Sequence, residues 1–113
     1  KNSFIAIIAI SVFALIYALA PSQSKVQSQE VVSIAEVQEI IETHCVSCHA
    51  SEPSSEIFAV APNGFMVETK EQIIAHKSQI YQQAVLSKAM PLGNSTKMTE
   101  EERDKLRAWA EAE

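Results

Sequence analysis

Two cysteines and a histidine at a fixed spacing, Cys45-Val46-Ser47-Cys48-His49, limit the possible folds of this chain more than any other segment. Residues three apart lie on one side of a helical turn, so the thiols of Cys45 and Cys48 can reach the same bound group. The imidazole of His49, one residue further on, can then point at the centre of that group. These are the only cysteines among 113 residues, which is too few for a scaffold held together by disulfide bonds.

The C-x-x-C-H pattern is the attachment signature of a c-type haem. The two thiols bond to the two vinyl groups of one porphyrin, and the histidine ligates the iron. The sequence therefore predicts one covalently bound haem, held by Cys45, Cys48 and His49. Two other sites use similar residues. A thiol redox pair would need a thioredoxin-like strand context, and a structural zinc would need His44 and His76 as further ligands, without a recognisable finger spacing.

The second axial ligand of the iron has five candidates in this chain: Met66, Met90, Met98, His44 and His76. His44 adjoins Cys45 and shares its side of the haem, and a lone helical histidine such as His76 is more often a surface or half-buried residue. Met66 is typical of core packing, and Met98 of a side chain that packs on the helix after it. Met90 precedes a proline in a loop with enough chain to reach the opposite face. We therefore predict Met90, with Met98 second. A thioether ligand stabilises reduced iron and raises its potential.

The N-terminal segment is almost entirely apolar from Phe4 to Ala20. At about 1.5 Å of rise per residue, its length reaches the lower limit for crossing a hydrocarbon core of about 30 Å. Lys1 precedes it, so the positive-inside rule predicts a cytoplasmic N-terminus and an outer location for the rest. A cleaved signal peptide is the alternative, because Ala18-Leu19-Ala20 has small residues at the cleavage positions, but Pro21 directly afterwards disfavours cleavage. We predict a transmembrane anchor over residues 1–20.

The rest of the chain divides into a polar tether over residues 21–32, rich in Ser and Gln, and a domain over residues 33–113. Three helices are predicted from their N-terminal signatures, namely Ser33 before an apolar stripe that leads into Cys45, Thr69 with Gln72, and Thr99 with Glu102. Apolar spacing extends the second of these helices as far as Val85. No strand pattern of useful length appears. The predicted fold class is all-α.

Two long loops separate the predicted helices. One contains Pro53, Pro62 and Gly64, and the other runs from Met90 to Asn94. Loops of this length are unusual in a small domain unless something fills the space between them. A haem would fill it.

The charge of the chain limits its partners. Lys1 is the only charged residue of the first twenty, which leaves 14 acidic and 8 basic residues for the rest. This acidic balance argues against nucleic acid, because phosphate binding needs clustered Lys and Arg. It favours a basic protein partner instead.

From Ser33 to Ala110 the chain resembles the class I cytochrome c family. The resemblance implies a small cytochrome c fold, with three to four short helices around one haem and a single transmembrane helix before it. It implies that the Val37/Ile41 stripe contacts Leu106 and Trp109, as the first and last helices do in that family. It also implies that Pro62 offers its carbonyl to the second ring proton of His49, and that Met90-Pro91 is the axial-ligand loop.

A narrower resemblance covers the same domain. The strings Phe58-Ala59-Val60-Ala61-Pro62, Ala89-Met90-Pro91-Leu92-Gly93-Asn94 and Lys97-Met98-Thr99-Glu100-Glu101-Glu102-Arg103 are similar to the C-terminal cytochrome domain of bacterial membrane-bound urate hydroxylases. In those proteins a multi-helix membrane domain oxidises urate, and the fused cytochrome passes the electrons to the respiratory chain. The resemblance implies that Phe4 to Ala20 is a final membrane helix and Lys1 an internal residue. None of these 113 residues is expected to oxidise urate.

The resemblance therefore implies an electron carrier, not an enzyme, in the bacterial inner membrane with its haem domain in the periplasm. Its partners would be redox proteins such as a respiratory complex or a terminal oxidase. The alternatives are a haem sensor or peroxidase with an open sixth position, and a haem subunit of a larger respiratory complex. We expect the haem walls to include Phe58, Phe65, Tyr81, Leu92 and Trp109, and an exposed haem edge to have Lys70, Lys77, Lys88 and Lys97 around it.

Overall fold

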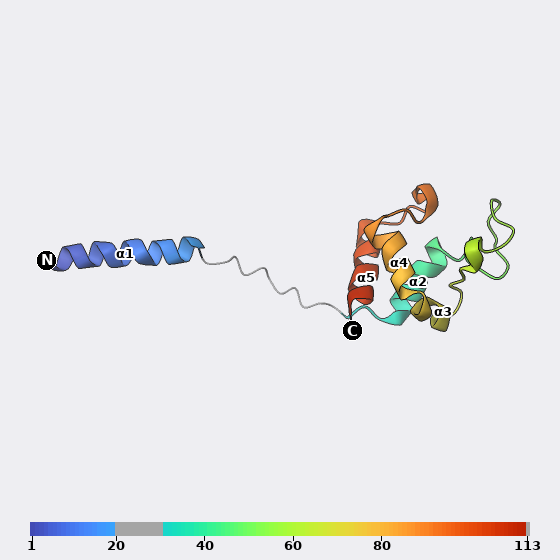
Figure 1. Ribbon diagram of the computed structural model, residues 1–113, viewed down its shortest axis with the longest axis horizontal. Helices are drawn as coiled ribbons and strands as arrows, with labels where there is room; N and C mark the ends of the chain where they lie inside the picture. Colours follow the sequence, from blue (N-terminus) through green and yellow to red (C-terminus); the bar gives the residue numbers. More distant parts are fainter. Residues whose placement is uncertain (20–30, 113) are drawn as a thin grey trace.

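The computed structural model describes residues 1–19 and 31–112, and these ranges are helical with no strand. The predicted tether, residues 21–32, lies outside the described residues except for its last two, as do Ala20 of the predicted anchor and Glu113 of the predicted domain. The helices are α1 (Asn2–Leu19), α2 (Ile34–His44), α3 (Lys70–Ala75), α4 (Lys77–Ile80) and α5 (Glu100–Glu111), and the short turns are η1 (Pro62–Gly64), η2 (Tyr81–Leu86) and η3 (Leu92–Asn94) (Figure 1).

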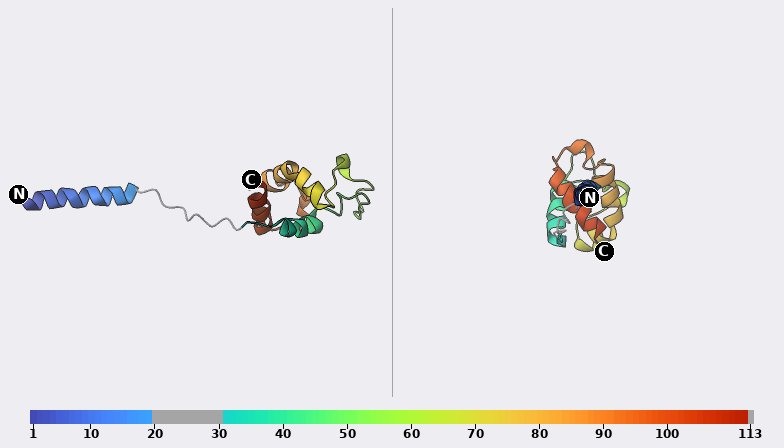
Figure 2. Two further views of the ribbon diagram at one scale, coloured as in Figure 1. Left: turned by 90° about the horizontal axis from the view of Figure 1, so that it is seen from below. Right: turned by 90° about the vertical axis from the view of Figure 1, so that its left-hand side faces the viewer.

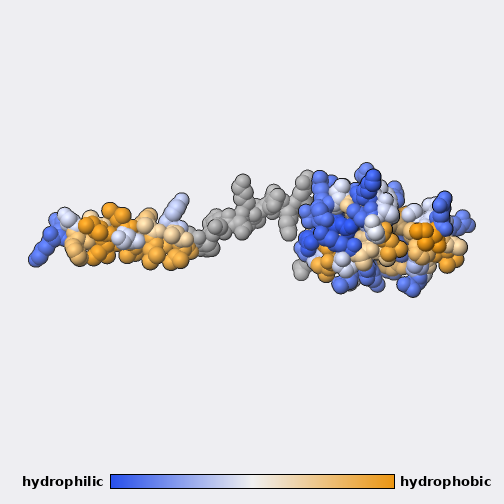
Figure 3. Space-filling model, turned by 90° about the horizontal axis from the view of Figure 1, so that it is seen from above, coloured by the Kyte–Doolittle hydropathy of each residue, from blue (hydrophilic) through white to orange (hydrophobic). Residues whose placement is uncertain are grey.

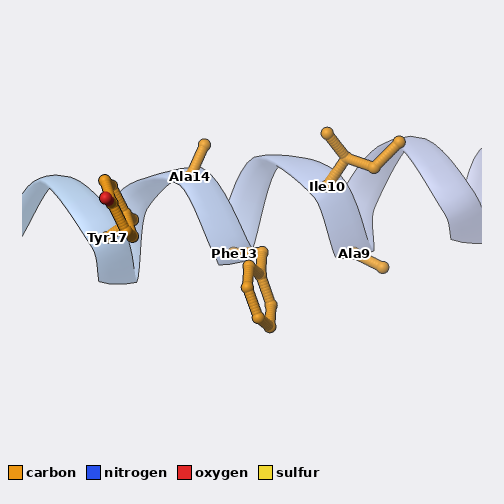
Figure 4. A pocket seen from close by; sticks show the side chains of 5 residues that line it. All are labelled: Ala9, Ile10, Phe13, Ala14 and Tyr17. Carbon is orange, nitrogen blue, oxygen red and sulfur yellow. The ribbon is translucent and has the colours of Figure 1, made fainter.

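Helix α1 is long and apolar enough to cross a membrane. A signal sequence near an N-terminus can have the same length and composition. Its 18 residues span roughly 27 Å at 1.5 Å per residue. None of its side chains is buried, and Figure 3 shows apolar side chains over most of its visible surface. The five side chains in Figure 4 line a shallow apolar hollow on this one helix. One of them, Tyr17, lies near the helix end, where aromatic rings favour the interface between membrane and water.

Helices α2, α3 and α5 begin at the residues that the sequence predicts. Ser33, Thr69 and Thr99 each accept a hydrogen bond from the backbone of the third residue of their helix, and that residue's side chain accepts one from the capping residue. At α2, for example, the Ser33 N–H lies 2.9 Å from a carboxylate oxygen of Glu36. These reciprocal bonds supply partners for backbone N–H groups that a helix start leaves free.

One hydrophobic core holds the domain together. It is formed by side chains of α2, α5 and the segment between them: Val37, Ile40, Ile41, Val67, Ile73, Ile80, Ala84, Val85, Met98, Leu106 and Trp109. Val37, Ile41 and Leu106 are fully buried, and α2 contacts α5, as the resemblance implies. Figure 2 shows the loop of residues 51–61 extending beyond these helices, at the end of the domain away from the C-terminus.

The predicted second helix is not continuous. It is divided into α3, α4 and the π-helical turn η2, with a break at His76, whose φ of −100° and ψ of 15° leave the helical region. Within α3, Ile73 is 1% exposed and Ile74 is 51% exposed, so the predicted apolar face is buried only in part. Because a π-helical turn holds an extra residue, η2 changes the facing of the residues after it. Ala84 and Val85, which lie within η2 itself, belong to the core.

Candidate functional site

The Cys45–His49 segment continues the helical path of α2 as a series of turns. The Cys45 N–H donates to the Ile41 carbonyl at 2.8 Å, and the His49 N–H donates to the Cys45 carbonyl at 2.9 Å. Cys45 and Cys48 are both half-buried, and neither forms a disulfide. The turn therefore holds two free thiols and an imidazole on one short stretch of backbone, as the spacing predicts.

Two cavities lie next to this segment, of about 530 Å³ and about 240 Å³. Four residues line both of them, namely Cys45, His49, Pro62 and Met90. Cys48 lines the smaller one. All five residues that the sequence predicts to bind the cofactor thus lie around one divided space, although they come from three separate parts of the chain. The volume of the larger cavity is typical of small-molecule and cofactor sites.

His49 is oriented by a backbone carbonyl. Its Nδ1 lies 2.9 Å from the carbonyl oxygen of Phe65. Because a carbonyl oxygen can only accept, Nδ1 carries the proton and Nε2 presents its lone pair. The ring of Phe65 also meets the His49 ring edge-on, with centroids 5.1 Å apart and an interplanar angle of 82°. Nε2 is therefore the nitrogen available to a metal.

This bond corrects the expectation that Pro62 provides the carbonyl. In the η1 turn the Pro62 carbonyl instead accepts the N–H of Phe65 at 3.1 Å. The turn is possible because Asn63 and Gly64 adopt positive φ values of 56° and 65°, a region that glycine and asparagine enter more easily than other residues. Pro62 still lines both cavities, so its role is to form the wall and not to orient the histidine.

The electrostatics of Cys45 disfavour a thiolate. Burial, with a smaller effect of the neighbouring Cys48, raises the pKa of the Cys45 thiol to about 12. Thiol redox sites work in the opposite way, with an attacking cysteine whose pKa is lowered. The Cys45 side chain is thus a poor match to the thiol-exchange alternative.

Met90 reaches the cavities from a backbone that is bonded on both sides. Its N–H donates to the Gln83 carbonyl at 3.1 Å, and its carbonyl accepts a hydrogen bond from Arg103 Nη1 at 3.0 Å. The Met90 side chain is half-buried. Of the three methionines, it alone lines either cavity.

The other candidates for the sixth ligand are engaged elsewhere or lie apart. Met98 is 4% exposed and belongs to the core. Both ring nitrogens of His44 are paired, Nδ1 with the Thr96 hydroxyl at 2.7 Å and Nε2 with a Glu102 carboxylate oxygen at 3.1 Å. Met66 is half-buried and lines neither cavity.

His76 is in a different position from these residues. It lines the larger cavity, and its ring stacks on Phe65 at a tilt of 40°, with centroids 4.3 Å apart. Its Nδ1 is buried without a hydrogen-bond partner.

Only some of the side chains predicted to form the haem walls and the haem edge lie where they were expected. Phe58, Phe65 and Leu92 line the cavities. Tyr81 instead donates its hydroxyl to Glu111 at 2.7 Å, and Trp109 is buried in the core. Two of the four lysines predicted around the haem edge contact side chains of α5. Lys77 Nζ lies 5.3 Å from the centre of the Trp109 ring, and Lys88 Nζ lies 2.8 Å from a carboxylate oxygen of Glu100.

Sequence reasoning missed Arg103 altogether, because a charged residue in a capped amphipathic helix is normally assigned to its solvated face. Arg103 is 5% exposed. The only signal in the sequence was its position three residues before Leu106, which places both on one face of α5.

The residues present fit a haem by their donor chemistry. Two unbonded thiols, an imidazole with Nε2 free and a thioether surround the divided cavity. The residues fit a zinc site less well. Within residues 1–19 and 31–112, no three His, Cys, Asp or Glu side chains are grouped so that they could hold a metal ion. Comparison of the chain with protein-family models, with curated proteins and with solved structures finds no match.

Proposed function

We propose that the helical domain is a c-type cytochrome domain that carries single electrons through one covalently bound haem. The haem would be bonded to Cys45 and Cys48 and ligated by His49 and Met90. The observation that carries this proposal is that Cys45, His49 and Met90 line the same two adjoining cavities, although Met90 is remote from the other two in sequence.

Bound in this way, the haem supplies a one-electron change between ferric and ferrous iron. The chain's own residues determine how readily that change occurs. The Phe65 carbonyl keeps the His49 ring in one orientation and makes Nε2 a stronger donor. A thioether from Met90 favours the ferrous state, and apolar walls such as Phe58 and Val67 exclude water. His49 and Met90 would together fill both ligand positions that the haem leaves to the protein, so none would remain for a substrate.

We further propose that α1 anchors the domain to the bacterial inner membrane, with the haem domain in the periplasm. The length and apolar composition of α1 support an anchor. The partners would then be redox proteins of the same membrane, such as a respiratory complex or a terminal oxidase. The narrower resemblance favours the cytochrome part of a urate-oxidising membrane protein.

Covalent attachment is tested on the full chain, produced in cells that attach haem outside the cytoplasmic membrane. We expect haem to remain on the polypeptide through a denaturing gel, and the joint change Cys45→Ala and Cys48→Ala to abolish this. Ser47→Ala alters the motif at a position that needs no particular side chain, so it serves as the matched control and should retain haem. Loss of haem from the wild-type chain on denaturation would refute the proposal.

A further inference from the structure

Arg103 is a cation inside the domain. It lies in α5, and its side chain is only 6% exposed. Placing a charge in the interior is costly unless hydrogen bonds compensate for the lost water. Arg103 Nη1 donates to two carbonyl oxygens, those of Ala84 and Met90, the second at 3.0 Å. The guanidinium therefore bridges two backbone positions that precede α5 in the chain.

Both carbonyls need a donor from outside their own segment. Ala84 lies in the last turn of η2, where a helical carbonyl has no N–H further along to accept. Met90 lies in the loop between η2 and η3, so its carbonyl belongs to no helical hydrogen-bond series. The Nη1 group carries two N–H bonds, so it can donate to both carbonyl oxygens at once.

The same bond holds the backbone of Met90 from its second side. The Met90 N–H is bonded to the Gln83 carbonyl, and its carbonyl to Arg103, while its side chain lines the cavities. We propose that Arg103 is a positioning residue that keeps Met90 in place as axial ligand. This inference rests on the proposed function, since it presumes an iron between His49 and Met90.

Charge pairing at the surface does not account for the position of Arg103. Its Nε lies 3.9 Å from a carboxylate oxygen of Glu100, but the Glu100 side chain is 71% exposed and is also bonded to Lys88. Exposed pairs of this kind contribute little to stability. The buried hydrogen bonds to the two carbonyls are therefore the main interactions of this side chain.

The test measures how easily imidazole displaces the methionine from ferric iron, using the full chain with haem attached. Arg103→Met removes every donor of this side chain. Loss of this charge-assisted hydrogen bond should raise the apparent affinity for imidazole about tenfold or more. The sulfur-to-iron absorption band should weaken in parallel. Arg107→Met is the matched control, because Arg107 lies in the same helix with a 42% exposed side chain, and it should change neither quantity.

Two further variants separate positioning from general destabilisation. In a Met90→Ala background, Arg103→Met should have no further effect on imidazole affinity, because no methionine is left to hold. Arg103→Lys keeps the charge but lacks the planar fork, so a smaller rise in affinity is expected, and this variant replaces Arg103→Met if the latter does not fold.

Equal imidazole affinities in Arg103→Met and Arg107→Met would overturn the inference, as would an equal effect of Arg103→Met with and without Met90. A different result points to the proposed function itself: if Met90→Ala leaves the wild-type affinity unchanged, Met90 is not the ligand, and the assignment of the iron site fails before Arg103 is considered.

Discussion

His49 donates its Nδ1 proton to the Phe65 carbonyl, and that single bond determines which ring nitrogen is free. A second histidine, His44, is buried and differs in having both ring nitrogens hydrogen-bonded. Its Nε2 lies 3.1 Å from a carboxylate oxygen of Glu102, and its Nδ1 lies 2.7 Å from the Thr96 hydroxyl. The two histidines lie five positions apart in the sequence, yet only His49 can offer a nitrogen to iron.

The carboxyl group of Glu102 makes the free energy of unfolding depend on pH. The hydrogen bond from the Thr99 backbone N–H, and to a smaller extent the bond with His44, holds the pKa of the Glu102 carboxyl below its ordinary value. A lowered folded-state pKa stabilises the fold fully above the unfolded-state pKa of about 4.3, and this contribution is lost as pH falls through the folded-state value. Glu102→Gln should therefore reduce the free energy of unfolding at neutral pH, with a difference that shrinks at acid pH.

Urea unfolding of the two proteins at a series of pH values measures this difference. Glu101→Gln, at an exposed acid in the same helical turn, is the control and should leave the pH profile unchanged. A wild-type and Glu102→Gln difference that stays constant from neutral pH down to about pH 3 would contradict the role given to the carboxylate.

Single residues also show where sequence reasoning stops. The spacing of Cys45, Cys48 and His49 is local, so it predicted the arrangement of these groups on one turn. The partner of His49 was predicted wrongly, as Pro62, because every residue carries a carbonyl and only the turn decides which one faces the ring. In this chain the η1 turn uses the Pro62 carbonyl and presents that of Phe65.

At the scale of elements, the helix starts were predictable and the course of the second helix was not. Ser33, Thr69 and Thr99 cap their helices through side chains three residues away, a pattern visible in the sequence. The break at His76 depends instead on tertiary contact, since its ring stacks on Phe65 from a different segment. Apolar spacing continues through the break and therefore gives no sign of it.

The packing of α5 on the core is tested at Leu106, which is fully buried. Leu106→Ala should lower the free energy of unfolding by about 2–5 kcal/mol, through lost apolar burial and the cavity that remains. Leu86→Ala deletes the same atoms from a side chain that is 50% exposed, and should cost well under half as much. Denaturant unfolding of the haem-loaded proteins provides both values, and equal losses would show that α5 is not packed as described.

At the scale of the whole molecule, α1 and the domain differ in how far their apolar side chains are buried. Every described side chain of α1 is exposed, whereas the domain encloses its own core. Figure 3 shows the same contrast, with apolar side chains over most of α1 and many hydrophilic ones on the domain. Hydropathy of the sequence predicted this division directly, because apolar composition over a membrane-length segment needs no tertiary information.

Lysine substitutions within α1 test whether this helix attaches the chain to the membrane. Ile8→Lys with Leu15→Lys places two lysines within the apolar segment, each costing about 2.5–3.5 kcal/mol at the centre of a membrane helix. We expect this variant to lose retention in the membrane fraction after an alkaline wash. Asn2→Lys adds a lysine at the end of the helix and should remain bound. Retention of the double variant would mean that α1 is not what holds the chain to the membrane.

The most direct test of the iron site is the absorption spectrum of the full haem-loaded chain, oxidised and reduced, with and without CO. We predict low-spin iron in both states, a weak long-wavelength sulfur-to-iron band in the ferric protein that disappears in Met90→Ala, and no CO complex at the ferrous iron. A high-spin ferric spectrum with prompt CO binding would contradict the His49/Met90 ligand pair and place the chain among haem sensors or peroxidases.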